Sequence, residues 1–295
     1  MRWVGDGPRV VPSEQRKPIW LLPNLLSLDA PLVAVAWLYI FAKTWRVDYL
    51  PWAAYISLGL VVWVIYMTDR LLDASMNGGN SEKLEARHDF HRKHQRVFRV
   101  VVVTAGVLAL VLVVSGLPMR IYGDAAIGGI LVAGFFALSI FSTHGPNEIP
   151  YAKNLLAGLS FAYGTAMIAY VFTGFEMWEF VRSRELICFS VLCILNISAI
   201  DLWEHANRSS DPEIKATDEL ALTLPLTLLG AASLVFASQD RELTTRPFFY
   251  AILTGAALLH ILNRTRSRFS MDALRVLADV ALLVPFIVFL AASAP

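Results

Sequence analysis

Two pairs of acidic residues stand out in a sequence that has few charges. Asp69 and Asp73 are four residues apart, and Asp201 and Glu204 are three apart, so each pair lies on one face of a helix. Like charges one turn apart destabilise a helix unless a partner compensates them, and Mg²⁺ with a phosphorylated ligand is one such partner. The pairs therefore point to a magnesium and phosphate site. The alternative interpretation is two helix ends in water, neutralised by Arg70 and nearby histidines.

A single basic residue, Lys153, lies in the short connection 145–154. Its ammonium would stand at the start of a helix, where free backbone amides and the positive dipole end attract anions. A cation at this position would stabilise a bound diphosphate, whereas it is unfavourable for the helix itself. The alternative is a lysine whose ammonium reaches the lipid headgroups.

A basic loop follows the first acidic pair. It carries Arg87, Arg92 and Arg96, together with histidines at three-residue spacing. His88 and His91 share a helical face, which permits a transition-metal site, but the surrounding cations repel a metal ion. A loop that covers a phosphate explains all of these charges together.

These groups must be positioned by membrane helices. Of the 295 residues, 56% are hydrophobic and only 17% are charged, which excludes an ordinary soluble domain. The net charge of +1 gives no excess of basic residues of the kind that binds nucleic acid. A span needs about twenty mostly apolar residues. That window predicts nine helical spans, at 25–43, 51–68, 97–116, 123–142, 154–174, 185–203, 218–237, 247–263 and 272–293.

The loops between these spans predict the orientation. Eighteen of the 25 Lys and Arg residues fall on the side that holds the N-terminus. By the positive-inside rule, the N-terminus is cytoplasmic in the cell's inner membrane. We expect one transmembrane domain over 1–295, with cytoplasmic segments at 1–24, 69–96 and 204–217.

The first acidic segment resembles a motif of the UbiA superfamily of intramembrane prenyltransferases, whose members have nine helices. The run Asp69-Arg70-Leu71-Leu72-Asp73 is similar to the second half of the family's first Asp-rich motif. Ile65 and Tyr66 stand where the leading Asn-Asp of that motif would be.

Two further segments extend the resemblance. Asp201 and Glu204 are similar to the family's second acidic motif, and Thr223-Leu224-Pro225 looks like the Thr-Leu-Pro that opens helix seven. The loop that ends in Lys153-Asn154 is similar to the family loop with a phosphate-contacting lysine.

The resemblance implies an all-α helical barrel with a lateral opening to lipid. It implies a prenyltransferase that moves a prenyl group from a prenyl diphosphate to an aromatic or other lipophilic acceptor. Mg²⁺ is the implied cofactor, held by Asp69, Asp73, Asp201 and Glu204, and it would improve the diphosphate as a leaving group. The substrate-binding residues so implied are Lys153, Asn154, Arg70, Arg87, Arg92, Tyr66 and Asn24.

Aromatic faces near the cytoplasmic ends are candidates for stabilising the allylic cation. Tyr66, Tyr163 and Trp203 are the residues we would test, although Trp and Tyr also collect at membrane interfaces.

Two further carboxylates fall in or near spans. Asp29 is a candidate for binding or deprotonating an acceptor, whereas Asp279 has Arg275 one turn before it, which predicts a structural ion pair.

Three other functions remain open on the sequence. A UbiA-type terpene cyclase would capture the cation within its own chain. A non-catalytic membrane protein would bind an isoprenoid lipid or help a protein partner to assemble. A transporter is disfavoured, because the ionisable residues gather at one face and form no relay at mid-membrane.

Overall fold

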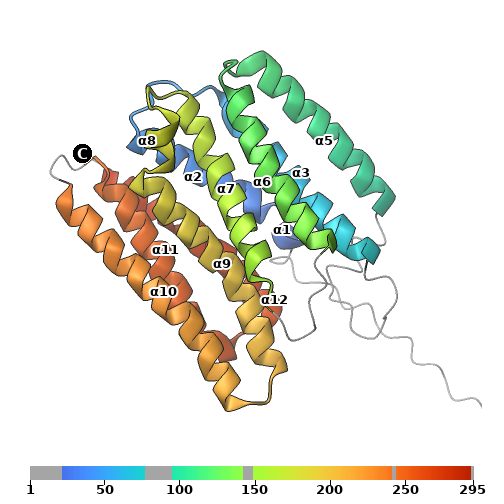
Figure 1. Cartoon of the computed structure of the whole chain (residues 1–295), viewed down its shortest axis with the longest axis vertical. Coiled ribbons are helices and arrows are strands. Elements are labelled where there is room, and N and C mark those ends of the chain that lie inside the picture. The colour runs from blue at the N-terminus through green and yellow to red at the C-terminus, as the bar shows by residue number, and fades with distance from the viewer. Residues whose placement is uncertain (1–21, 77–94, 142–148, 241–243, 294–295) are drawn as a thin grey trace, which may run out of the picture.

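A computed structural model describes residues 22–76, 95–141, 149–240 and 244–293, and these residues form helices without any strand (Figure 1). The all-α prediction is confirmed. The helices are α1 (Leu22–Leu25), α2 (Asp29–Thr44), α3 (Trp52–Met76), α5 (Gln95–Gly116), α6 (Ile121–Phe141), α7 (Tyr151–Val171), α8 (Met177–Val181), α9 (Arg184–Arg208), α10 (Pro212–Gln239), α11 (Arg246–Thr265) and α12 (Met271–Ser293), with a 3₁₀ turn at Arg266–Arg268.

A long helix occupies each of the nine predicted ranges in the described part of the chain. Seven of these helices are long and apolar enough to cross a membrane, namely α3, α5, α6, α7, α9, α10 and α12. With 16 residues, α2 is shorter than a full span. The ends of α11 are polar, from Arg246 to Arg264. The chain is thus a membrane protein, and the number of nine spans stays a prediction.

Two helices are longer than we predicted at the end of the bundle that carries the acidic pairs. The expected loop 204–217 shrinks to 209–211, because α9 continues to Arg208 and α10 begins at Pro212. Asp211 caps α10 by accepting a hydrogen bond from the Glu213 amide at 2.9 Å, and proline is favoured at the first helical position. In the same way α3 continues to Met76, so Asp69 belongs to a helix and not to a loop.

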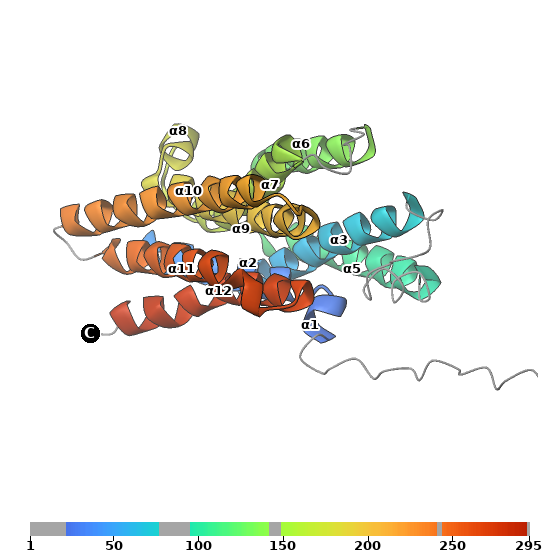
Figure 2. The same ribbon diagram turned by 90° about the horizontal axis from the view of Figure 1, so that it is seen from below.

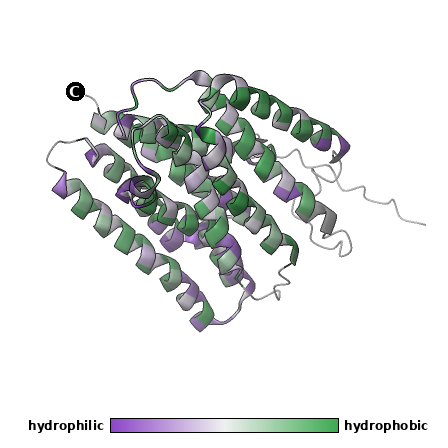
Figure 3. Cartoon of the chain, turned by 45° about the horizontal axis from the view of Figure 1, so that its top comes forward, coloured by the Kyte–Doolittle hydropathy of each residue, from purple (hydrophilic) through white to green (hydrophobic). Residues whose placement is uncertain are grey.

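The centre of the bundle is formed by α2, α7 and α9. In the apolar segments of α9 and α7, 67% and 61% of the residues are buried, against 6% in α5 and 11% in α6. Trp37 of α2 stacks on Phe189 of α9 with ring centroids 4.4 Å apart. The outer faces of the peripheral helices are apolar, as lipid contact requires (Figure 3).

A small residue sets the close crossing of α7 and α9. A Cβ atom added at Gly158 would lie 2.7 Å from the backbone nitrogen of Ile194. The two helices therefore approach as closely as their backbones allow, which brings the start of α7 near the end of α9.

Candidate functional site

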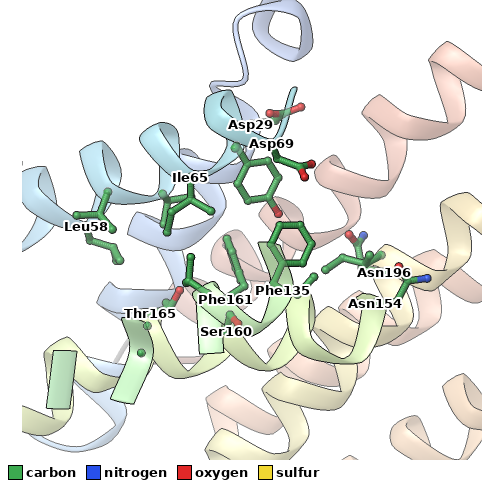
Figure 4. Close-up of a pocket in the computed structure, with 18 of the residues that line it drawn as sticks. Asp29, Leu58, Ile65, Asp69, Phe135, Asn154, Ser160, Phe161, Thr165 and Asn196 are labelled. Carbon is green, nitrogen blue, oxygen red and sulfur yellow. The ribbon is translucent and has the colours of Figure 1, made fainter. Parts of the chain in front are cut away.

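The site is a cavity of about 600 Å³ whose polar end lies where α3 and α9 finish and α2, α7 and α12 begin (Figure 4). These helix ends come from distant parts of the sequence, and together they place eleven polar and charged residues around one end of the cavity. The polar and charged residues at this end are Asn24, Asp29, Asp69, Arg70, Lys153, Asn154, Asn196, Asp201, Glu204, Arg275 and Asp279.

The first turn of α7 connects the two acidic segments. The Lys153 ammonium lies 3.9 Å from Oδ1 of Asp69. Next to it, Nδ2 of Asn154 donates a hydrogen bond to Oδ2 of Asp201 at 2.8 Å. Lys153 also lies within electrostatic range of Asp201, so its positive charge stands between the two acidic segments.

Glu204 has two arginine partners. Its Oε1 accepts a hydrogen bond from Arg275 at 2.5 Å, and its Oε2 accepts one from Arg208 at 3.0 Å. Arg275 is 3% exposed and also lies 3.4 Å from Asp272. We expected Arg275 to pair with Asp279, and the structure gives it Glu204 and Asp272 as partners instead.

A second group of polar residues lies where α1 and α2 meet α3 and α12. Asp29 accepts a hydrogen bond from Nδ2 of Asn24 at 2.6 Å, and the Arg70 guanidinium donates to the Asn24 carbonyl at 2.6 Å. The Asp279 carboxyl lies beside that of Asp29. Asp29 therefore lines the cavity within a group that also holds Asp279.

Among the residues that the structure describes, more carboxyl groups than cations line the cavity. There are five carboxyl groups, against three cations. A positively charged ligand or metal ion would improve this balance, whereas an anion needs a cation to accompany it.

Three aromatic rings lie along the cavity. The rings of Tyr66 and Phe161 meet edge to face at 6.4 Å, and Phe135 lies 5.3 Å from the Lys153 ammonium. Tyr66 thus lines the cavity, and its role toward a substrate stays a prediction. Tyr163 and Trp203 are buried elsewhere, where they donate hydrogen bonds to the Asp124 carbonyl and to Asn263.

Away from its charged end the cavity is apolar, and it runs between two helix pairs. α5 packs on α3 and α6 packs on α7, while the pairs meet each other mainly where α3 touches α7. Figure 2 shows the pair α6–α7 lying apart from the pair α3–α5. The apolar lining comes from all four helices and includes Leu58, Val62, Ile65, Val113, Leu117, Ile121, Ala125, Gly128, Gly129, Val132, Phe161, Gly164 and Ile168.

Eight of the eleven predicted site residues line this one cavity. Three fall outside what the structure describes: the side chain of Asp73, and Arg87 and Arg92. The sequence reasoning missed Phe135 and Asn196, since neither belongs to a charged motif. Asn196, one turn and a half before Asp201 in α9, could have been found from its place on a long apolar helix. The eight are Asn24, Tyr66, Asp69, Arg70, Lys153, Asn154, Asp201 and Glu204.

The fit of a magnesium ion depends on Asp69 and Asp201. Among the described residues, no three His, Cys, Asp or Glu side chains are grouped as a metal site. The two carboxylates nevertheless face a point that already holds a positive charge, the Lys153 ammonium. Mg²⁺ usually takes one or two carboxylates and fills its shell with water and phosphate oxygens, so an ion held by this pair would have to replace the ammonium between them.

Comparisons with known proteins give no match. No protein-family model fits the chain, and no curated protein or solved structure is significantly similar to it.

Proposed function

We propose that the chain is an intramembrane prenyltransferase that moves a prenyl group from a prenyl diphosphate to an aromatic or other lipophilic acceptor. The observation that carries this proposal is the shape of the cavity. A charged end and an apolar end share one space, which matches a ligand with a diphosphate head and a hydrocarbon tail. The UbiA resemblance of the sequence supports the same activity.

In this proposal the charged end binds the diphosphate. Asp69 and Asp201 hold Mg²⁺, which when bound neutralises the diphosphate and makes it a better leaving group. Lys153 donates hydrogen bonds to the departing phosphate oxygens, and Asn154 fixes the Asp201 carboxylate by its 2.8 Å hydrogen bond.

The aromatic rings next to the charged end then face the carbon from which the diphosphate departs. Tyr66, Phe135 and Phe161 offer ring faces to an allylic cation, an interaction worth about 2 kcal/mol in a desolvated site. The Asp29 carboxylate, oriented by Asn24, takes the proton that the acceptor loses.

The apolar end houses the prenyl tail. The sparse contact between the α3–α5 and α6–α7 pairs supports entry of the tail from the lipid through this gap. A lipid-borne substrate then need not leave the membrane to reach the charged end.

The test is pyrophosphate release by the purified protein with Mg²⁺ and prenyl diphosphates of several lengths. We expect release that needs Mg²⁺, stops with EDTA and rises with an aromatic acceptor. No release with any chain length or acceptor would refute the proposal. Release without acceptor that yields a cyclic hydrocarbon would assign a terpene cyclase instead.

A second candidate is a protein that binds an isoprenoid without catalysis. It is favoured by Glu204, whose two oxygens are both held by arginines, and by the lack of a three-residue metal site among the described residues. Saturable prenyl diphosphate binding that Mg²⁺ leaves unchanged, with no turnover, would distinguish it.

A further inference from the structure

The apolar end of the cavity stops at the short connection between α5 and α6. Leu117 and Ile121, one on each side of this connection, line the cavity and are 8% and 2% exposed. Leu58 of α3 and Met167 of α7 also line it, in the parts of their helices away from the charged groups, and both are buried. All four side chains belong to the packed apolar core. We call these four residues the floor of the cavity.

The connection that carries the floor is fixed to both helix pairs. A Cβ atom added at Gly116 would lie 2.8 Å from the Cβ of Ala53, so the end of α5 packs closely on the start of α3. On the other side, the Arg120 guanidinium donates hydrogen bonds to the Tyr170 hydroxyl and to the Phe175 carbonyl, both at 2.7 Å, and lies 4.7 Å from the Tyr170 ring. The connection therefore bridges the α3–α5 and α6–α7 pairs at this end of the cavity.

The helical rise gives the distance from the charged end to the floor. Leu58 precedes Asp69 by eleven residues on α3, which corresponds to about 16 Å (Figure 4). On α6, Ile121 precedes Phe135 by fourteen residues, which corresponds to about 21 Å. Since Phe135 lies beside the Lys153 ammonium, both distances run from the charged end. The apolar part of the cavity is therefore about 16–21 Å deep.

This depth matches a tail of four isoprene units. Three bonds of an extended peptide chain cover about 3.3–3.6 Å, so the four chain bonds of one isoprene unit cover about 4.5 Å. Four extended units then reach about 18 Å, and five reach about 23 Å. A tail of four units would end at the floor, whereas a tail of five units would be too long for the cavity.

We propose that the floor limits the prenyl donor to four isoprene units, as in geranylgeranyl diphosphate, and that Arg120 is a positioning residue that maintains this limit. Arg120 acts through the connection between α5 and α6, because it holds the residue next to Ile121 against the end of α7. This inference rests on the proposed function for the diphosphate head and for turnover. It adds the length of the donor and a role in specificity for residues at the opposite end from the charged groups.

The test measures pyrophosphate release by the full-length protein in lipid nanodiscs, with donors of three, four and five isoprene units. We expect farnesyl and geranylgeranyl diphosphate to react at rates within about threefold of each other, and geranylfarnesyl diphosphate at least about tenfold more slowly, since the fifth unit has no room. Nanodiscs are used because they leave lipid beside the gap between the helix pairs, so a tail that prefers to leave sideways can do so.

Two neighbouring alanines test the position of the floor. Ala125 lines the cavity one turn after Ile121 and is exposed, so a leucine there takes up part of the cavity without repacking the core. Ala125→Leu should slow geranylgeranyl diphosphate at least about tenfold and leave farnesyl diphosphate within twofold of wild type. Ala126→Leu is the matched control, since Ala126 is exposed outside the cavity, and it should keep the wild-type pattern.

The role of Arg120 has its own readout, the rate with the five-unit donor relative to the rate with farnesyl diphosphate. Arg120→Met removes both hydrogen bonds and the charge over the Tyr170 ring, and it should raise this ratio roughly 3- to 10-fold. Arg182→Met is the control, because Arg182 also lies over an aromatic ring, that of Trp178, and should leave the ratio unchanged. A lower Tm with an unchanged ratio in Arg120→Met would refute this role.

Equal turnover of all three donors by the wild type, or an unchanged pattern in Ala125→Leu, would overturn the limit and show that the tail leaves through the gap into the lipid. The absence of release with every donor is instead a failure of the proposed function. In that case the Kd values of the same three diphosphates decide the limit. Weaker binding of the five-unit compound alone would support it, and equal binding or no binding would overturn it.

Discussion

The Asp201 carboxylate is held by the Asn154 amide at 2.8 Å and lines the cavity together with Asp69. Replacing it with Asn keeps an oxygen for that hydrogen bond but removes the charge. We expect Asp201→Asn to fold normally and to lower the rate of pyrophosphate release by about 100-fold or more.

The matched control for this change is Glu219→Gln. Glu219 is also an acid near this end of the bundle, but it pairs with Arg264 and Arg266 and does not line the cavity. Its removal should leave the rate within twofold of wild type, which is about 0.4 kcal/mol. Equal losses in the two variants would mean that Asp201 acts only through folding.

A separate prediction concerns the contribution of Lys153 to the affinity for a prenyl diphosphate. Lys153→Met keeps a flexible apolar stem of similar length but removes the ammonium that lies 3.9 Å from Asp69. We expect the Kd for farnesyl diphosphate to rise roughly 10- to 100-fold, the range for one charge-assisted hydrogen bond. Lys215→Met, on the exposed part of α10, should leave the Kd unchanged, and an equal rise there would point to a general charge effect.

At the level of helices, the crossing of α7 and α9 holds the site together. A Cβ atom at Gly158 would clash with the backbone of Ile194, so Gly158→Ala must push the two helices apart. We expect a lower Tm, from a destabilisation of about 1–3 kcal/mol, and a loss of turnover as Asn154 moves away from Asp201. Gly123→Ala meets nothing within 4 Å, so its Tm should stay equal or rise.

The apolar end of the cavity should set the length of chain that is accepted. Gly164 lines the cavity, and nothing lies within 4 Å of a Cβ added there, so Gly164→Phe has room to fill part of the space. We expect turnover of geranyl diphosphate to persist and that of geranylgeranyl diphosphate to fall at least about tenfold, since overpacking by an aromatic ring costs 1–3 kcal/mol. Gly106→Phe on α5, outside the cavity, is the control. A parallel loss with both substrates would contradict the assignment of the tail to this region.

Hydropathy alone predicted where the long helices lie, and seven of the apolar runs are as long as a bilayer is thick. It missed the helical extensions past the lipid boundary, such as α9 beyond Glu204, because those turns are polar and depend on caps like Asp211. Charge placement predicted most of the polar end of the cavity, since intramembrane charges are few. Phe135 could not be predicted, because an aromatic residue on an apolar helix has no distinctive pattern.

The sequence also did not predict which residues the charged groups pair with. Arg275 precedes Asp279 by one turn, which favours a local pair, yet the packing of α12 on α9 brings Glu204 to Arg275 at 2.5 Å. Local spacing predicts contacts within one helix, whereas contacts between helices depend on how the helices pack.

For the whole molecule, the distribution of basic residues predicts that the charged end of the cavity faces the cytoplasm. Cys188 and Cys193 are buried, so an added surface cysteine can be labelled against a low background. A membrane-impermeant maleimide should label Ser210→Cys only in inside-out vesicles and Met119→Cys only in right-side-out vesicles. The reverse pattern would invert the predicted orientation.

The most direct test of the central claim, that one cavity holds both head and tail of a prenyl diphosphate, is photo-crosslinking. The probe is a farnesyl diphosphate analogue with a diazirine on its last isoprene unit, and the crosslinked peptides are mapped by mass spectrometry. We predict labelling of α3, α6 and α7 along the apolar lining, competed by farnesyl diphosphate and weakened by Lys153→Met. Labelling confined to the lipid-facing surfaces, or unchanged by competitor and by Lys153→Met, would contradict it.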